Sequence, residues 1–258
     1  MFKKSLIALM TVAILLVAAC GGAKEEAKKE APAAAPAASA PAASDADAGS
    51  ITGKISFAGA APAPKNISMD ATPACSRQHS TPPKSEEVIV GAGGTLKNVF
   101  VYIKAGLPAK EWPAPSEAVV LDQNSCIYKP HVIGVMVNQE IEIRNSDPTN
   151  HNVHPLPKVN REWNESQAPK SDPKRKSFPR EEVMIAIKCN VHPWMRSYVG
   201  VVNHPFHAVS GDDGSFTIKG VPPGEYTVEA WHEKFGVQES KVTVAPKESK
   251  SADFSFKG

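Results

Sequence analysis

The fold of this chain is decided by the stretch Cys189-Asn190-Val191-His192-Pro193-Trp194-Met195, which holds a thiol, an imidazole and a thioether. Alternating apolar residues precede it at 183–188, and a valine-rich run follows it at 198–202. Both patterns predict β-strands. We therefore expect the three donor side chains to share a tight loop between two strands.

The donors on this loop predict copper. A thiolate and an imidazole with a weak thioether are typical of trigonal copper sites that transfer electrons. Such a site needs a second imidazole, which His151 or His154 can supply. Zinc is disfavoured, because it prefers tetrahedral nitrogen and sulfur sets and a thioether is a poor zinc ligand.

Composition predicts an all-β fold class. The chain of 258 residues is long enough for one or two domains. Proline is abundant, valine and isoleucine occur in short runs, and long helical periodicity is absent. The net charge of +2 gives no reason to expect a nucleic acid partner.

The N-terminus indicates export. Lys3 and Lys4 precede an apolar run over 6–19 that is shorter than the roughly 20 residues needed to span a bilayer. Small residues then lead directly into Cys20, and this resembles the lipobox of bacterial lipoproteins. The resemblance implies a signal peptide over 1–19 and lipidation of Cys20. The protein would then be anchored to the cell membrane or outer membrane, facing the periplasm or the cell exterior. An ordinary secretory signal with an incidental cysteine is the alternative.

Residues 20–49 contain almost only alanine, proline, lysine, glutamate, serine and aspartate. No apolar face offsets the entropy cost of ordering such a segment, so we predict a disordered tether.

Two further cysteines, Cys75 and Cys126, remain after Cys20 and Cys189 are assigned. In an oxidising compartment, a disulfide between them is the natural interpretation. The alternative is a second metal site that uses Cys75 with His79, or Cys126 with His131.

Short apolar runs bounded by glycine and proline predict strands along the rest of the chain. Asp213-Gly214 and Pro223-Gly224 predict turns between antiparallel strands. The polar segment 155–180 is expected to be an exposed loop, with Lys174-Arg175-Lys176 as a solvated cluster; a docking patch for an acidic redox partner is the alternative. The predicted strands lie near 51–57, 88–90, 99–103, 118–121, 132–137 and 140–144.

Residues 117–204 resemble the cupredoxins, and most closely the amicyanins. The resemblance rests on Cys189-x-x-His192-Pro193-x-Met195 and on the upstream segment His151-Asn152-Val153-His154. It implies a Greek-key β-sandwich with one type 1 copper ion bound by His151, Cys189, His192 and Met195. His154 is the alternative to His151.

We expect Asn152 and Asn190 to surround these ligands. Cupredoxins often have a hydroxyl residue where Asn190 stands, so the hydrogen bonds around the sulfur should differ here. Pro193 and Trp194 are expected to flank the His192 ring edge in an apolar surface patch, where an electron enters or leaves.

The remaining segments resemble the carboxypeptidase regulatory-like domain, a small non-catalytic transthyretin-type β-sandwich. Asp213-Gly214-Ser215-Phe216 and Pro222-Pro223-Gly224-Glu225-Tyr226 carry this resemblance. It implies that 50–116 and 205–258 supply strands of one sandwich, with the cupredoxin inserted between them. A serial arrangement is the alternative. The combination is also similar to exported proteins described as methylamine-utilisation-like.

Three functions follow as hypotheses. The first is a membrane-anchored blue copper protein that carries single electrons between redox protein partners. The second is a lipoprotein that holds or delivers copper, and the third is a cell-surface interaction module that needs no metal. An enzyme is not expected, because no catalytic triad or carboxylate pair is present and four protein ligands leave no open metal position.

Overall fold

The computed structural model describes residues 45–258, and the chain there is almost entirely β-structure, as predicted. The signal peptide over 1–19, Cys20 and most of the predicted tether lie outside the described residues. Helical structure is limited to η1 (Asp45–Asp47), α1 (Pro73–Ser76) and η2 (Ala92–Gly94). In this part of the chain, no helix has the length and apolarity to cross a membrane.

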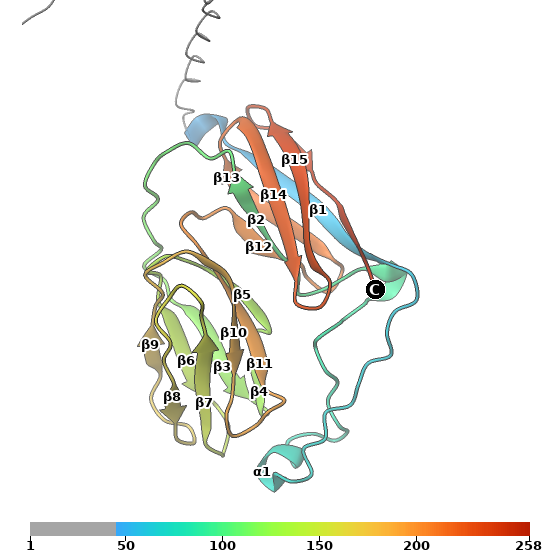
Figure 1. Ribbon diagram of the computed structural model, residues 1–258, viewed down its shortest axis with the longest axis vertical. Helices are drawn as coiled ribbons and strands as arrows, with labels where there is room; N and C mark the ends of the chain where they lie inside the picture. Colours follow the sequence, from blue (N-terminus) through green and yellow to red (C-terminus); the bar gives the residue numbers. More distant parts are fainter. Residues whose placement is uncertain (1–44) are drawn as a thin grey trace, which may run out of the picture. The chain divides into compact units, whose positions relative to one another are not determined.

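Strands from both ends of the described chain build a first lobe of two sheets (Figure 1). One sheet has the order β13-β1-β16 with β17 also on β1, and the other has the order β12-β2-β14-β15. The bounds are β1 Gly49–Ala58, β2 Phe100–Ala105, β12 His207–Val209, β13 Ser215–Val221, β14 Gly224–His232, β15 Gly236–Val244, β16 Ser249–Ser251 and β17 Phe254–Lys257.

The first lobe is held together by pairs of strands that are distant in sequence. Ile55 of β1 pairs with Phe254 of β17, and Ile103 of β2 pairs with Val228 of β14. In β17, buried phenylalanines alternate with exposed polar residues, which directs one face into the core. Strands before and after the intervening segment therefore share one apolar core.

The intervening segment forms a second lobe, also of two sheets. Their orders are β5-β11-β10-β7-β8 and β4-β3-β6-β9. The bounds are β3 Val119–Asn124, β4 Ile127–Lys129, β5 Val132–Met136, β6 Ile141–Asn145, β7 His151–Leu156, β8 Glu165–Gln167, β9 Lys174–Lys176, β10 Glu182–Lys188 and β11 Arg196–Val202. A separate apolar core lies between the two sheets and includes Cys189 and Met195.

Close packing on Phe100 joins the lobes. Phe100 forms a buried cluster with Tyr102, Val132 and Val202. A Cβ added at Gly200 would lie 2.5 Å from a Phe100 ring atom, closer than real contacts allow. Glycine at this position therefore lets the ring lie directly on the β11 backbone.

A long segment between β1 and β2 extends to the second lobe. We call residues 66–84 the cap segment. Its ends meet at the bridge between Asn66 and Lys84, and two of its apolar residues, Met69 and Cys75, are buried in the core of the second lobe.

Three local predictions were wrong. The predicted strand at 88–90 has only an isolated bridge, between Val90 and Leu96. The predicted loop 155–180 contains β8 and β9, because the basic cluster of β9 pairs with glutamates of neighbouring strands. The last residues of the predicted tether contain η1 and the start of β1, where Lys247 donates its amide hydrogen to the Asp47 carbonyl.

Candidate metal centre

The loop between β10 and β11 is a tight turn that gathers its donor side chains. The Cys189 amide donates to the Met195 carbonyl at 3.2 Å, and the Met195 amide donates to the His192 carbonyl at 3.0 Å. These two hydrogen bonds close the chain on itself between the strands. Cys189, His192 and Met195 are buried as a result.

His151, the first residue of β7, completes the cluster. Its Nδ1 lies 2.8 Å from Nδ1 of His192, and the Cys189 Sγ lies 3.9 Å from the same His192 atom. The donor atoms of these three residues all lie within 4.8 Å of one another. The structure therefore brings the predicted imidazole and thiolate ligands together, and it buries Met195 in the same apolar cluster as Cys189.

Asp147 is a functional residue that the sequence interpretation missed. Its carboxylate is 1 % exposed and accepts a hydrogen bond from Nε2 of His151 at 2.8 Å. It also accepts from the amides of Ser125 and Cys126, at 2.6 and 2.7 Å. A carboxylate on the far nitrogen fixes the tautomer and orientation of a metal-binding histidine. Asp147 thereby leaves Nδ1 of His151 facing His192.

The electrostatics favour the metal-binding protonation states of Cys189 and His192, whereas they favour the protonated form of His151 while the metal is absent. Burial raises the pKa of the Cys189 thiol, but hydrogen bonds from His151 and from nearby backbone amides outweigh it and lower that pKa. Burial lowers the pKa of His192 to about 4, with a further contribution from the charge of His151. Burial also lowers the pKa of His151, but the hydrogen bonds to Asp147 and Cys189 reverse this and raise it.

This donor set fits copper. Two imidazoles and a thiolate with a low pKa are the ligands of trigonal copper sites, and a neighbouring thioether suits the weak axial position. The low pKa of His192, about 4, favours the neutral imidazole that a metal ion requires. Cys189 and Met195 lie in a buried apolar cluster.

His154 lies outside the cluster. Its Nδ1 is 3.1 Å from Oδ1 of Asn190, and its Nε2 contacts Glu162. The Asn190 side chain thus lies beside His154. Asn152 is the amide next to the sulfur: its Oδ1 accepts from the Cys189 thiol at 3.3 Å and from the Asn190 amide at 2.8 Å.

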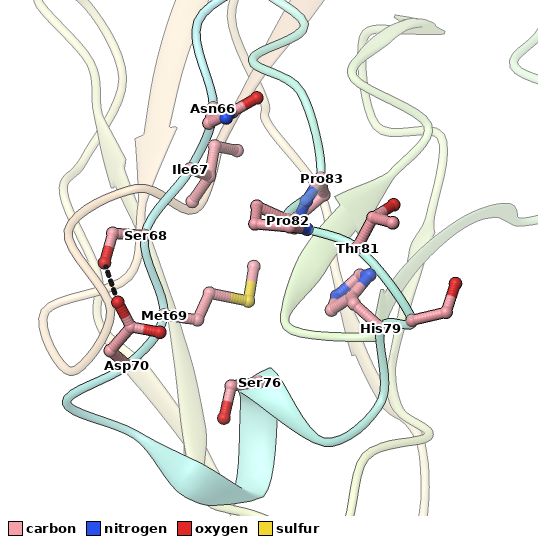
Figure 2. Close-up of a pocket in the computed structure, with 11 residues that line it drawn as sticks. Asn66, Ile67, Ser68, Met69, Asp70, Ser76, His79, Thr81, Pro82 and Pro83 are labelled. Carbon is pink, nitrogen blue, oxygen red and sulfur yellow. Dashed lines mark hydrogen bonds between the residues drawn. The ribbon is translucent and has the colours of Figure 1, made fainter.

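The structure joins Cys75 and Cys126 in a disulfide, with Cα atoms 5.6 Å apart. Neither cysteine is then available for a second metal site with His79 or His131. Nε2 of His79 donates to the Ser125 carbonyl at 2.8 Å, which fastens the cap segment beside the bridge. A pocket of about 360 Å³ lies within the cap segment, and the Met69 sulfur points into it (Figure 2).

The disulfide covers the outer edge of His192. The Cys75 Sγ lies 3.6 Å from Nε2 of His192, and the Trp194 indole donates to the Cys126 carbonyl at 3.0 Å. We had expected this ring edge to face an apolar surface patch formed with Pro193 and Trp194. The structure shows otherwise: His192 is 1 % exposed, because the cap segment supplies a neighbour that the loop sequence does not reveal.

Three further histidines are buried, and none belongs to a metal-type cluster of the described residues. His131 is buried with Glu233 as its partner, and His204 and His232 are buried in aromatic surroundings. Within residues 45–258, the two metal-type clusters are His151 with Cys189 and His192, and His151 with Cys126 and Asp147. The second is closed to a metal ion while Cys126 is in the disulfide.

Comparison with known proteins gives one family match. The sequence profile of the carboxypeptidase regulatory-like domain matches residues 198–257, which include β12 to β17 of the first lobe. Comparison with curated proteins finds no match.

Solved structures similar to parts of this chain include several copper proteins. A purple cupredoxin from Nitrosopumilus maritimus is 18 % identical over 32 % of this chain and 98 % of its own, with a TM-score of 0.28. A mutant of amicyanin in its Cu(I) form is 23 % identical over 39 % of this chain and 97 % of its own, with a TM-score of 0.29. A copper-containing nitrite reductase from Thermus scotoductus is 17 % identical over 39 % of this chain and 25 % of its own, with a TM-score of 0.30. These scores are low, so the case for a metal centre rests on the geometry described above.

Proposed function

We propose that this chain is a type 1 copper protein that carries single electrons between redox protein partners. His151, Cys189 and His192 would hold the ion, with Met195 as the axial thioether. The observation that carries the proposal is the convergence of two imidazole Nδ1 atoms and one thiol in a buried, preformed cluster. Copper bound there supplies one-electron redox chemistry.

The protein supplies rigidity. Cys189 follows the end of β10, His151 begins β7, and Lys188 of β10 pairs with His154 of β7. Asp147 fixes the His151 ring, and the disulfide lies against the His192 ring. Side chains held in this way move little between two oxidation states, which favours fast electron transfer over substrate turnover.

The proposal includes export and lipid attachment at Cys20, as the N-terminal sequence suggests. It includes no enzymatic activity, because four protein ligands leave no position for a substrate.

Loading the purified protein with Cu(II) tests the proposal. We expect an intense colour and a narrow copper hyperfine splitting in the electron spin resonance spectrum. Cys189→Ser should abolish the colour, whereas His154→Ala should keep it, since His154 lies outside the cluster. A colourless protein with an ordinary tetragonal signal would instead support copper storage or delivery, and failure to bind copper would support a metal-independent interaction module.

A further inference from the structure

The covered edge of His192 raises the question of where a redox partner makes contact. A partner cannot touch this imidazole, because the Cys75 sulfur and the Trp194 ring lie against it. The cap segment is tied down there by the disulfide and by the His79 hydrogen bond. Electron exchange directly at the His192 ring is therefore blocked in the folded protein while the disulfide between Cys75 and Cys126 is formed.

A groove on another side of the same loop reaches a different ligand. It has a volume of about 460 Å³, and Cys189 itself is among the residues that line it. Its other lining residues include Ile187 at the end of β10 and Asn190 and Pro193 on the loop. Cys189 is 2 % exposed, and a partner seated in this groove lies against this ligand residue rather than against the cap segment.

The chemistry of the groove favours one class of partner. Lys188 and Arg196 line it, and no carboxylate does. Neither cation is within salt-bridge distance of a carboxylate in the described part of the chain. Leu156 in the groove is 41 % exposed, and Val191 on the loop is 55 % exposed. Two unpaired cations beside exposed apolar side chains complement a surface with carboxylates around an apolar centre.

The cap side has the opposite character. A second pocket, of about 420 Å³, is lined by Trp194 and by three glutamates, Glu86, Glu87 and Glu233, and Arg196 and His131 also line it. An acidic partner is repelled from this side and attracted to the groove. Arg196 borders both pockets, but Lys188 lines only the groove and the three glutamates line only the cap side, so the two sides differ in charge.

We propose that the groove at Cys189 is the docking surface for a redox protein whose contact surface carries carboxylates around an apolar centre. The inference rests on the proposed function. A Cu(II) ion held by His151, Cys189 and His192 would become Cu(I) by accepting one electron from the reduced partner, which would be oxidised by one electron. No bond forms or breaks, and no proton moves.

Small inorganic oxidants test the route in the absence of the partner. The Cu(I) protein is mixed in a stopped-flow instrument with anionic hexacyanoferrate(III) or with the cationic tris(phenanthroline)cobalt(III) ion, and loss of Cu(I) is followed by the returning colour. Lys188→Glu should slow the anionic reaction about tenfold at low ionic strength and accelerate the cationic one. Both effects should shrink as salt is added.

Two control variants show whether the change in rate depends on the position of the charge. Lys129→Glu makes the same charge change on an exposed β4 residue outside the groove, and it should change both rates much less. Glu86→Lys, on the cap side, should also have little effect. If Lys129→Glu matches Lys188→Glu, only net charge matters and the groove is not the route. If Glu86→Lys has the dominant effect, electrons leave through the cap side. A protein without the type 1 colour overturns the proposed function itself, whereas a coloured protein with unchanged Lys188→Glu kinetics overturns only the docking proposal.

Discussion

Asp147→Asn gives the sharpest view of how the protein positions its metal ligand. The carboxylate accepts three hydrogen bonds, from the Ser125 amide, the Cys126 amide and Nε2 of His151. A carboxamide of the same shape has only one oxygen. At least one of these donors then faces an NH₂ group, and the charge that favours a hydrogen on Nε2 is lost.

The expected loss can be estimated in two ways. A hydrogen bond to a charged group contributes roughly 1.5–3 kcal/mol. Removing the outer partner of a metal-binding histidine typically lowers metal affinity by about 10–100-fold, which equals roughly 1.4–2.8 kcal/mol. Because the two ranges agree, we expect Asp147→Asn to weaken Cu(II) binding by about 10–100-fold.

Competition between the protein and a chelator of known affinity measures this change, with the visible spectrum as a second readout. Asp122→Asn is the matched control, because among residues 45–258 that carboxylate accepts a side-chain hydrogen bond from Ser146 Oγ alone, at 2.9 Å. Circular dichroism establishes that both variants are folded. Equal copper affinity and identical spectra in wild-type protein and Asp147→Asn would refute the positioning role.

Three other predictions concern stability. Burial lowers the pKa of His207 to about 4 from the ordinary 6.5. As the pH falls from 6.5 to 4, this histidine is therefore protonated in the unfolded state but stays neutral in the folded state. The contribution of neutral His207 to the free energy of unfolding is complete above pH 6.5 and declines by roughly 3 kcal/mol towards pH 4. In urea unfolding, His207→Gln should therefore lose less stability than wild-type protein over this pH range. Identical pH slopes in the two proteins would contradict this. Changing Cys75 and Cys126 together to serine removes a disulfide whose cysteines are 51 positions apart in the sequence. The free energy of unfolding, measured by denaturant titration, should fall by about 4 kcal/mol. A loss under about 1 kcal/mol would mean that other contacts hold the cap segment. Gly200→Ala should lower stability by about 1–3 kcal/mol in thermal unfolding, because the new Cβ would lie 2.5 Å from a ring atom of Phe100. Gly211→Ala is the control: its Cβ would lie 3.6 Å from the nearest atom, so its Tm should change little. Equal Tm shifts in the two variants would disprove the packing argument.

The sequence predicts the parts of the site that are local. Cys189, His192 and Met195 are close in the chain, so any tight loop between strands brings them together. The period of the apolar residues likewise predicts β-structure without knowledge of the sheet order.

Asp147 and the cap segment escape prediction because their roles depend on distant residues. Asp147 stands only four positions before His151, in a polar run that resembles an ordinary turn. Its importance comes from the amides of Ser125 and Cys126, which arrive from the turn after β3. The signal available in the sequence was a carboxylate shortly before a predicted metal-binding histidine. Similarly, nothing near Cys75 in the sequence indicates that its sulfur lies against His192.

The basic residues 174–176 show the same limit. Lys174, Arg175 and Lys176 have no apolar periodicity, so they suggested a solvated loop. They form a strand because β6 presents Glu142 and β8 presents Glu165 to them. Cross-strand charge pairs of this kind depend on which strands become neighbours.

The pairing of β1 with β17 has a consequence for how the protein is made. Ile55 pairs with Phe254, so the first lobe closes only after residue 254 has left the ribosome or, in an exported chain, the membrane channel. Contacts over such long separations make folding slow, and an unpaired apolar strand in the meantime can add to the edge of another chain. The second lobe draws its strands from one continuous segment and has no such delay. We therefore expect the second lobe, which carries the donor side chains, to fold first. The first lobe should be the part of the chain that is prone to aggregate before folding is complete.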